Sequence, residues 1–231
     1  GLSLKPVEGG MVYFAWATGS DINGSESDLG TNCGYGGLCT ATDGGNTIYR
    51  AQPERSDNLE LGTKWELFDK RLLVTASAFQ TIKDGVFEGG SDSYLATGSL
   101  NSGKIRVRGV EFGFAGNITS RLSGQVSAAL MKSKVLKAVI SADNVGRRLA
   151  NFADNSFDAQ LRYQLTDRIA LGGTMTYQSE MFGGQPDTAA AWNAAAGTYS
   201  IRVPSYTTYG AFVSYKVNEN LSVRVNAVNL T

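Results

Sequence analysis

Apolar and polar residues alternate strictly along several segments of this chain. In the clearest case, residues 156–166, the odd positions hold Phe, Ala, Leu, Tyr and Leu, and the even positions hold Ser, Asp, Gln, Arg, Gln and Thr. A period of two places the two sets on opposite faces of a β-strand. The same pattern recurs at residues 58–67, 169–177, 209–217 and 221–225. The alternation therefore predicts an all-β protein.

The predicted strands are long. Strands of soluble domains usually have about five or six residues, whereas about ten tilted residues are enough to cross a bilayer. We therefore expect a transmembrane antiparallel up-and-down β-barrel. About nine strands are predicted, at residues 11–19, 57–67, 72–82, 104–117, 122–134, 155–165, 169–182, part of 199–217, and 221–230.

One predicted strand changes the parity of its apolar positions. In residues 104–117 the apolar side chains occupy odd positions before Gly109 and even positions after it. A β-bulge adds one residue to a strand, and glycine tolerates the backbone angles that a bulge often needs. We therefore predict a bulge at Gly109 that keeps all of these apolar side chains on one face.

Tight turns alternate with long loops along the chain. The four predicted turns end 50, 47 and 52 positions apart and lie at residues 68–71, 118–121, 165–168 and 217–220. The loops between them are rich in Gly, Ser, Asn and Asp and lie at about residues 20–56, 83–103, 133–154 and 180–200. Outer-membrane barrels have short turns on the periplasmic side and long loops outside the cell. The rhythm therefore predicts that these loops are extracellular.

The composition excludes two classes of protein. The 21 basic and 21 acidic residues balance, and the chain has no basic run, so no nucleic-acid partner is expected. No stretch approaches about 18 consecutive apolar residues, which argues against a transmembrane helix. The mean hydropathy of −0.15 still suits a membrane barrel, because alternating strands average to neutral values.

The polar faces of the predicted strands carry charges of both signs. A narrow barrel would have to bury these charges at considerable cost, whereas a wide lumen can hydrate or pair them. The pattern therefore favours a wide barrel. The charged residues expected to point into its lumen are Glu60, Lys64, Glu66, Arg106, Arg108, Glu111, Asp158, Arg162 and Arg224.

Aromatic residues gather near both ends of the predicted strands, as in the girdles at the two bilayer interfaces. The alternative is that aromatic residues are simply common in strands. Those near turns are Trp65, Phe68, Tyr163 and Tyr215, and those near loops are Phe79, Tyr177 and Tyr209.

Two features indicate that the chain is part of a barrel. An odd number of strands does not fit a bacterial single-chain barrel, which has an even number. The chain also ends in Asn-Leu-Thr without a further strand ending in an aromatic residue. We therefore expect both ends to continue into further strands.

Four motifs resemble segments of TonB-dependent siderophore receptors, in the same order and over nearly the whole chain. They resemble the strand after a long loop, an Arg-Gly-Val-Glu strand, a Val-Pro-Ser-Tyr strand entry and the segment before the final strand. The catecholate-type branch is the most similar. The motifs are residues 52–65 (QPERSDNLELGTKW), 107–111 (VRGVE), 203–206 (VPSY) and 226–231 (NAVNLT).

This resemblance implies a fold and a function. Residues 1–231 would be the C-terminal part of a barrel of about 22 strands, and the plug domain and first barrel strands would lie outside this chain. The complete protein would import ferric siderophores across the bacterial outer membrane, with energy from the TonB–ExbB–ExbD system acting through the plug. Outer-membrane lipid and lipopolysaccharide would surround the wall. Neither catalysis nor a resident cofactor is expected.

The resemblance also suggests roles for charged and aromatic residues, although solvated wall or loop residues are the alternative for each. We expect Arg106, Arg108, Glu111 and Arg162 to contact the plug or to line the transport path. In the loops, flat aromatic surfaces and positive charge would suit an anionic ferric chelate. The candidates are Tyr35, Tyr94, Arg147, Arg148, Trp192, Tyr199 and Arg202.

The chain has two cysteines and no histidine. Cys33 and Cys39 lie in the longest loop, and the cell exterior is oxidising, so we predict a disulfide between them. Neither a zinc cluster nor a catalytic arrangement that needs histidine can form from this set.

Two other functions remain open at this point. A passive porin-like channel would share the alternation, the turns and the loops. A soluble all-β adhesin or binding module would instead bury the apolar faces in a core.

Overall fold

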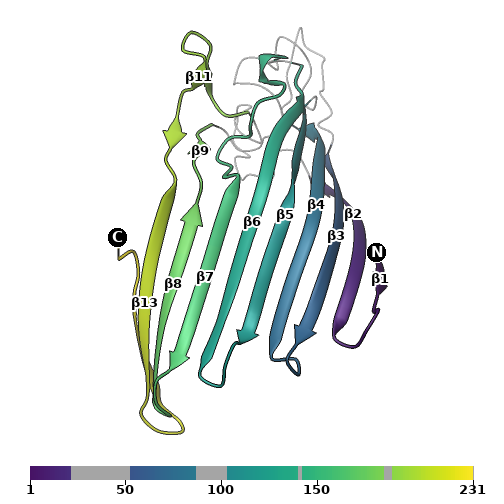
Figure 1. Cartoon of the computed structure of the whole chain (residues 1–231). Helices are drawn as coiled ribbons and strands as arrows, with labels where there is room; N and C mark the ends of the chain where they lie inside the picture. The colour runs from purple at the N-terminus through teal and green to yellow at the C-terminus, as the bar shows by residue number, and fades with distance from the viewer. Residues whose placement is uncertain (22–52, 87–102, 140–141, 185–188, 231) are drawn as a thin grey trace, which may run out of the picture.

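The computed structural model describes residues 1–20, 53–86, 103–139, 142–184 and 189–230 in full and the backbone of Asp21. Ten antiparallel strands form one sheet in the order β1-β2-β3-β4-β5-β6-β7-β8-β13-β14 (Figure 1). They are β1 (Leu2–Leu4), β2 (Gly10–Asp21), β3 (Glu54–Leu67), β4 (Leu72–Val86), β5 (Gly103–Asn117), β6 (Leu122–Lys137), β7 (Asn155–Gln164), β8 (Ile169–Gln178), β13 (Tyr206–Lys216) and β14 (Ser222–Ala227).

The up-and-down topology is confirmed, because every long strand pairs with its neighbour in the chain apart from the insertion between β8 and β13. Within the described residues the two outermost strands, β1 and β14, pair on one side only, so this sheet is an unclosed part of a barrel. The short β1 is an addition to the nine predicted strands. None of the helical segments in the described part of the chain has the length and apolar character needed to span a membrane.

Four tight turns lie at one end of the sheet, at the bottom of Figure 1. Three of them use one scheme, in which the second residue of the predicted turn accepts hydrogen bonds from two backbone N–H groups that follow it. Thr119, Thr166 and Asn218 are these acceptors, at 2.9 to 3.3 Å. In the fourth turn, residues 68–70 all have positive φ, between 53° and 63°.

The strands extend further toward the loops than the sequence predicts, since β4 reaches Val86 and β6 reaches Lys137. The predicted loop 180–200 contains two small ladders of its own. They pair β9 (Met181–Phe182) with β12 (Arg202–Val203), and β10 (Trp192–Asn193) with β11 (Thr198–Tyr199). The segment before β7 contains the short helix η1 (Ala142–Asn144).

The register of the strands defines two faces. Residues directly opposite one another share a face, and one such row across β3 to β8 is Gly62, Ser77, Glu111, Ala129, Ser156 and Gln178. The neighbouring row on the other face is Thr63, Ala76, Phe112, Ala128, Phe157 and Tyr177. We call the face of Glu111 the inner face and the face of Phe112 the outer face.

The outer face is the apolar one. Phe112 and Leu130 are about half exposed, and Leu61 is 58% exposed. A soluble protein would cover such a surface, whereas lipid covers it in a membrane barrel. The inner face carries Glu60, Lys64, Glu66, Glu111, Asp158, Arg162 and Arg224, as the alternation predicts.

The predicted bulge at Gly109 is wrong. The pairing of β5 with β4 and with β6 runs through this residue without interruption, and the register shifts instead next to Lys104 and near Asp84. Glycine is required at position 109 for a steric reason, because a Cβ atom there would lie 2.4 Å from the carbonyl oxygen of Leu130. The glycine therefore allows β6 to approach closely.

This uninterrupted register moves two predicted lumen residues to the other face. Arg106 and Arg108 lie on the outer face with Phe112, and Ile105 and Val107 lie on the inner face with Glu111. Phe79, expected in an aromatic girdle, also lies on the inner face, opposite Glu60.

The segment that leads into β7, residues 142–154, folds back over the inner face and explains the apolar residues there. We call it the folded-in segment. Leu149, which is 5% exposed, packs in one buried cluster with Val86, Ile105 and Val135, and Val107 lies against it. Near the turns, lipid covers the apolar side chains of β5 on the outer face. Near the loops, the folded-in segment covers them on the inner face. The apolar side chains therefore change face where the strand leaves the lipid.

Candidate functional site

The inner face holds two open hollows. One, of about 490 Å³, lies over β4 to β8 and is lined by Thr75, Gln125, Ser127 and Asp158, among others. The other, of about 420 Å³, lies over β2 to β7 and is lined by Tyr13, Glu60, Lys64 and Glu111, among others. Asp158 is the one charged side chain in the lining of the first hollow. The second is lined by Glu60, Lys64 and Glu111 and so carries both signs of charge, which suits water or a polar protein surface.

Some of the inner-face residues are held by neighbours on the same face. The Tyr13 hydroxyl donates a hydrogen bond to Glu60, and its ring lies over Gly62, where a Cβ atom would be 2.4 Å from it. Lys64 lies 5.3 Å from the Tyr13 ring centroid. Arg162 donates to the side chain of Gln164. Glu111 is exposed and is one of the residues that remain open to a partner inside the barrel.

A second candidate site lies at the loop end of the sheet, where segments far apart in the sequence meet. The Tyr199 ring stacks on Phe182 with centroids 4.3 Å apart, and Trp192 meets Tyr199 edge-on at 5.0 Å. The guanidinium carbon of Arg147 lies 4.5 Å from the Trp192 centroid, and that of Arg148 lies 5.0 Å from the Phe182 centroid. We call these five residues the mouth cluster.

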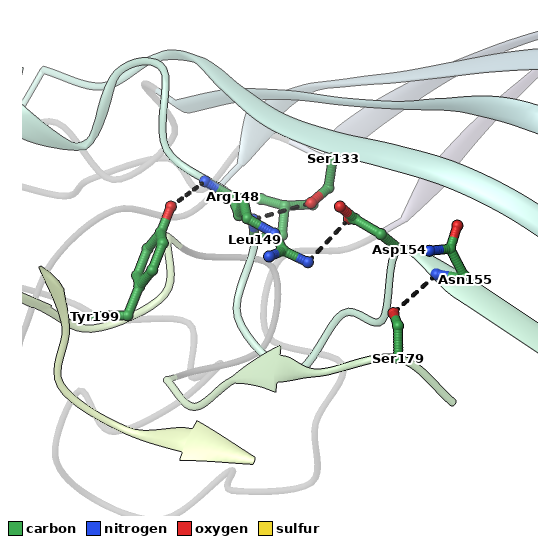
Figure 2. Close-up of polar contacts among 7 residues, drawn as sticks. All are labelled: Ser133, Arg148, Leu149, Asp154, Asn155, Ser179 and Tyr199. Atoms are coloured by element: carbon green, nitrogen blue, oxygen red, sulfur yellow. Dashed lines mark hydrogen bonds and ion pairs between the residues drawn. The ribbon is translucent and has the colours of Figure 1, made fainter. Parts of the chain in front are cut away.

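Hydrogen bonds fix the backbone beneath the mouth cluster (Figure 2). The Arg148 N–H donates to the Tyr199 hydroxyl at 3.1 Å, and the Leu149 N–H donates to Ser133 Oγ at 3.1 Å. At the start of β7, the Asn155 N–H donates to Ser179 Oγ at 3.0 Å. Residues 147–155 are therefore tied both to the wall and to the insertion between β8 and β13.

The three arginines predicted for this end differ in their partners. Arg148 forms an ion pair with Asp154 at 3.1 Å, with both side chains about a quarter exposed. Arg202 pairs with Glu180 at 2.8 Å and is well exposed. Arg147 forms no ion pair with any described residue. Its charge is thus the one of the three that no described carboxylate balances.

Four of the predicted ligand-binding residues therefore lie together: Arg147, Arg148, Trp192 and Tyr199. Arg202 is joined to Glu180 instead, while Tyr35, Tyr94 and the two cysteines lie outside the described residues. Two further residues of this region, Phe182 and Asp154, are not among the predicted site residues, since the sequence pattern places Phe182 at a strand end. No local pattern marks either residue, because their contacts depend on how two loops meet.

Chemically, the mouth cluster offers a cation that no carboxylate in the described part of the chain balances, beside exposed aromatic surface. Trp192 is 36% exposed. Arginine donates bidentate hydrogen bonds to anionic oxygens, and an aromatic face binds flat apolar or cationic groups. The cluster is therefore suited to a planar, anionic ligand arriving from the loop side.

Comparison with known proteins agrees with this architecture. A family model described as TonB dependent receptor-like, beta-barrel, matches residues 1–230. Bordetella pertussis BfrD, described as a probable TonB-dependent receptor, is 29% identical over the whole chain. The catecholate siderophore receptor Fiu of Escherichia coli K12 is 29% identical over 96% of the chain.

Solved structures give the same result. The closed form of Fiu from Escherichia coli, described as a ferric-catecholate import receptor, aligns over 99% of the chain with a TM-score of 0.73 and 27% identity. The siderophore receptor PiuA of Acinetobacter baumannii aligns over 99% with a TM-score of 0.74 and 24% identity, which shows the fold. The chain spans 27–30% of the length of these four matches. The chain belongs to the TonB-dependent receptor β-barrel family.

Proposed function

We propose that this chain is the C-terminal part of the barrel wall of an outer-membrane receptor that imports ferric siderophores with energy from TonB. The observation that carries the proposal is the family match along residues 1–230, on a sheet with an apolar outer and a charged inner face. The family is one of transport receptors. This match favours a receptor over a passive channel, and the exposed outer face opposes a soluble adhesin.

The proposal assigns ligand capture to the mouth cluster. Arg147 and Trp192 would contact the ferric chelate, because Arg147 lacks a carboxylate partner among the described residues and Trp192 is exposed. Arg148 and Tyr199 would hold the cluster in shape. A catecholate chelate combines planar rings with negative charge, which fits this pair of side chains.

The proposal assigns the inner face to the plug. Glu111 and Arg162 would face that domain, and the hollow lined by Tyr13, Glu60 and Lys64 would accept part of its surface. The TonB–ExbB–ExbD system would act on the plug from the periplasmic side. The disulfide between Cys33 and Cys39 remains a prediction.

Titration of the complete receptor with a ferric catecholate tests the capture site. Replacing Arg147 by glutamine removes a charge-assisted hydrogen bond of about 1.5–3 kcal/mol, so the affinity should fall by about 10-fold to 150-fold. The matched control is Arg121→Gln, which removes a cation from a turn at the opposite end of the sheet. Unchanged affinity for R147Q would remove Arg147 from the site. Failure of the unaltered receptor to bind or import any ferric siderophore would refute the function.

A further inference from the structure

Three pairs of like charges face each other across β5 and β6 on the outer face. Like charges directly opposite one another destabilise a sheet, so consecutive pairs need compensation. The pairs are Lys104 with Lys137, Arg106 with Lys134, and Arg108 with Lys132.

Only the uppermost pair has a counter-charge among the described residues. Lys104 Nζ lies 3.0 Å from Asp84 Oδ2. The other four cations, Arg106, Arg108, Lys132 and Lys134, form no ion pair with any described residue. We call these four the outer basic patch. Its members are exposed except Arg106, which is half-buried.

The patch lies at the upper edge of the apolar band. A strand rises about 3.4 Å per residue, and at a tilt of about 40° each residue adds about 2.6 Å along the membrane normal. A band about 25 Å tall therefore takes about ten residues. Arg108 is nine residues from Asn117, where β5 meets its turn (117 − 108 = 9). Its level is therefore that of the outer-leaflet head groups.

The patch is local. About eight to ten residues above the turn, none of the outer-face residues on the other described strands is basic, and Asp57 is the one charged residue among them. These residues are Thr18 and Ser20 on β2, Asp57 and Leu59 on β3, Gln80 and Ile82 on β4, Asn155 on β7, Tyr177 on β8 and Thr207 on β13. The cations thus form one concentrated site on β5 and β6 and not a general collar of the rim.

Apolar surface lies directly below the patch on the same two strands. Val110 and Leu130 are direct partners one step down, and Phe112 follows on β5. Phe112 and Leu130 are about half exposed. The surface therefore has cations above and apolar side chains beneath, the order of phosphate groups and acyl chains in a lipid of the outer leaflet.

From this arrangement we propose that the outer basic patch binds the phosphate groups of the outer-leaflet glycolipid, lipopolysaccharide, while its acyl chains lie on Val110, Phe112 and Leu130. The proposal goes beyond siderophore import and depends only on the orientation of the barrel. Arginine forms bidentate hydrogen bonds with phosphate, and lysine adds charge. Each phosphate would also separate cations that otherwise repel one another across the strands.

The test measures binding of defined lipids to the complete receptor in detergent by native mass spectrometry. Titrating with diphosphoryl lipid A and with the same lipid lacking both phosphates separates phosphate recognition from acyl-chain contact. The test variant carries Arg106→Gln, Arg108→Gln, Lys132→Gln and Lys134→Gln. The matched control neutralises four turn cations, Lys70, Arg71, Arg121 and Arg168. A second variant, with Arg106→Gln and Lys134→Gln alone, leaves half of the patch.

We expect the unaltered receptor and the turn control to prefer diphosphoryl lipid A. Each patch cation should contribute about fivefold to affinity. With additive contributions, the variant with four substitutions should lose about 600-fold in affinity and the variant with two should lose about 25-fold. Equal binding of both lipids, or equal affinity in the patch variants and the control, would overturn the proposal. Ferric-siderophore binding measured on the same samples should be unchanged, so a failure of lipid binding is distinct from a failure of the import function.

Discussion

Arg148 should anchor the folded-in segment at the mouth of the barrel, and replacing it by glutamine tests this role. The substitution removes the ion pair with Asp154 and the contact with the Phe182 ring. It leaves the Asp154 carboxylate, whose side chain is 29% exposed, without the charge that faces it. The segment should then open more often, while the strands below stay intact.

The magnitude follows from the exposure of the pair. Exposed ion pairs contribute about 0–1 kcal/mol, and breaking a buried pair costs about 3–5 kcal/mol. With the Arg148 and Asp154 side chains 24% and 29% exposed, we place this pair between those limits, at about 1–2 kcal/mol. The arginine–phenylalanine contact adds about 0.5–1 kcal/mol. A total of about 1.5–3 kcal/mol corresponds to about 10-fold to 150-fold in the opening equilibrium.

Amide hydrogen exchange on the complete receptor measures that opening. The informative amides are those of Gly146, Leu149 and Asn151, which donate to Val135 O, Ser133 Oγ and Phe182 O. Their exchange should accelerate by about 10-fold or more in R148Q, whereas amides in the membrane part of β5 and β6 should not change.

The matched control is Arg202→Gln. Its ion pair with Glu180 is 65% and 39% exposed, so its loss should change exchange by less than about fivefold. Unchanged exchange of residues 146–151 in R148Q would refute the anchoring role. So would acceleration spread evenly over the whole sheet, because that would indicate global destabilisation.

Two further predictions concern the wall, and both are measured as free energies of unfolding in urea from lipid vesicles. Gly116→Ala should destabilise the barrel by about 2–3 kcal/mol, because φ at Gly116 is +146° and the new Cβ would lie 2.1 Å from the carbonyl oxygen of Arg71. The control is Gly173→Ala, whose new Cβ would lie 3.5 Å from its nearest atom. Equal effects of the two substitutions would contradict this account. Phe112→Arg should lower the free energy of unfolding by about 2–4 kcal/mol, because it places a charge in lipid. Glu111→Gln on the inner face should lower it by less than about 1 kcal/mol. Similar losses for both would mean that the two faces are assigned wrongly.

Most of the wall could be predicted from the sequence. Strict alternation, as in residues 156–166, fixes both the strand and its two faces, since a shift by one residue would expose every apolar side chain to the wrong side. Turn chemistry at Thr119, Thr166 and Asn218 sets the short connections. The strand β1 has only three residues and too short a pattern to be recognised.

The interpretation of the parity change failed for a physical reason. Alternation shows which residues share a face, but it does not show what covers that face. Between Gly109 and the turn, lipid covers the apolar side of β5. Between Gly109 and the loop end, Leu149 covers Ile105 from inside the barrel. A bulge would follow only if one apolar environment covered the whole strand, and β5 has two.

The mouth cluster could be predicted only in part. Its residue types suggest recognition of an anionic, planar ligand, and Arg147, Arg148, Trp192 and Tyr199 are recognisable as candidates. Their meeting depends on the ladders formed by β9 to β12 and on the Tyr199 hydroxyl, which are long-range contacts. No short-range sequence pattern specifies such contacts.

The central claim is that β5 runs without a bulge and leaves the lipid near Arg108. A spin-label scan of residues 105–114 in the complete receptor, reconstituted in lipid vesicles, tests it most directly. The account predicts that labels at 110, 112 and 114 are accessible to oxygen in lipid and that labels at 106 and 108 are accessible to a water-soluble nickel chelate. It also predicts that labels at 105 and 107 are shielded from both reagents. Oxygen accessibility at 105 and 107, with 106 and 108 facing the lumen, would contradict the claim.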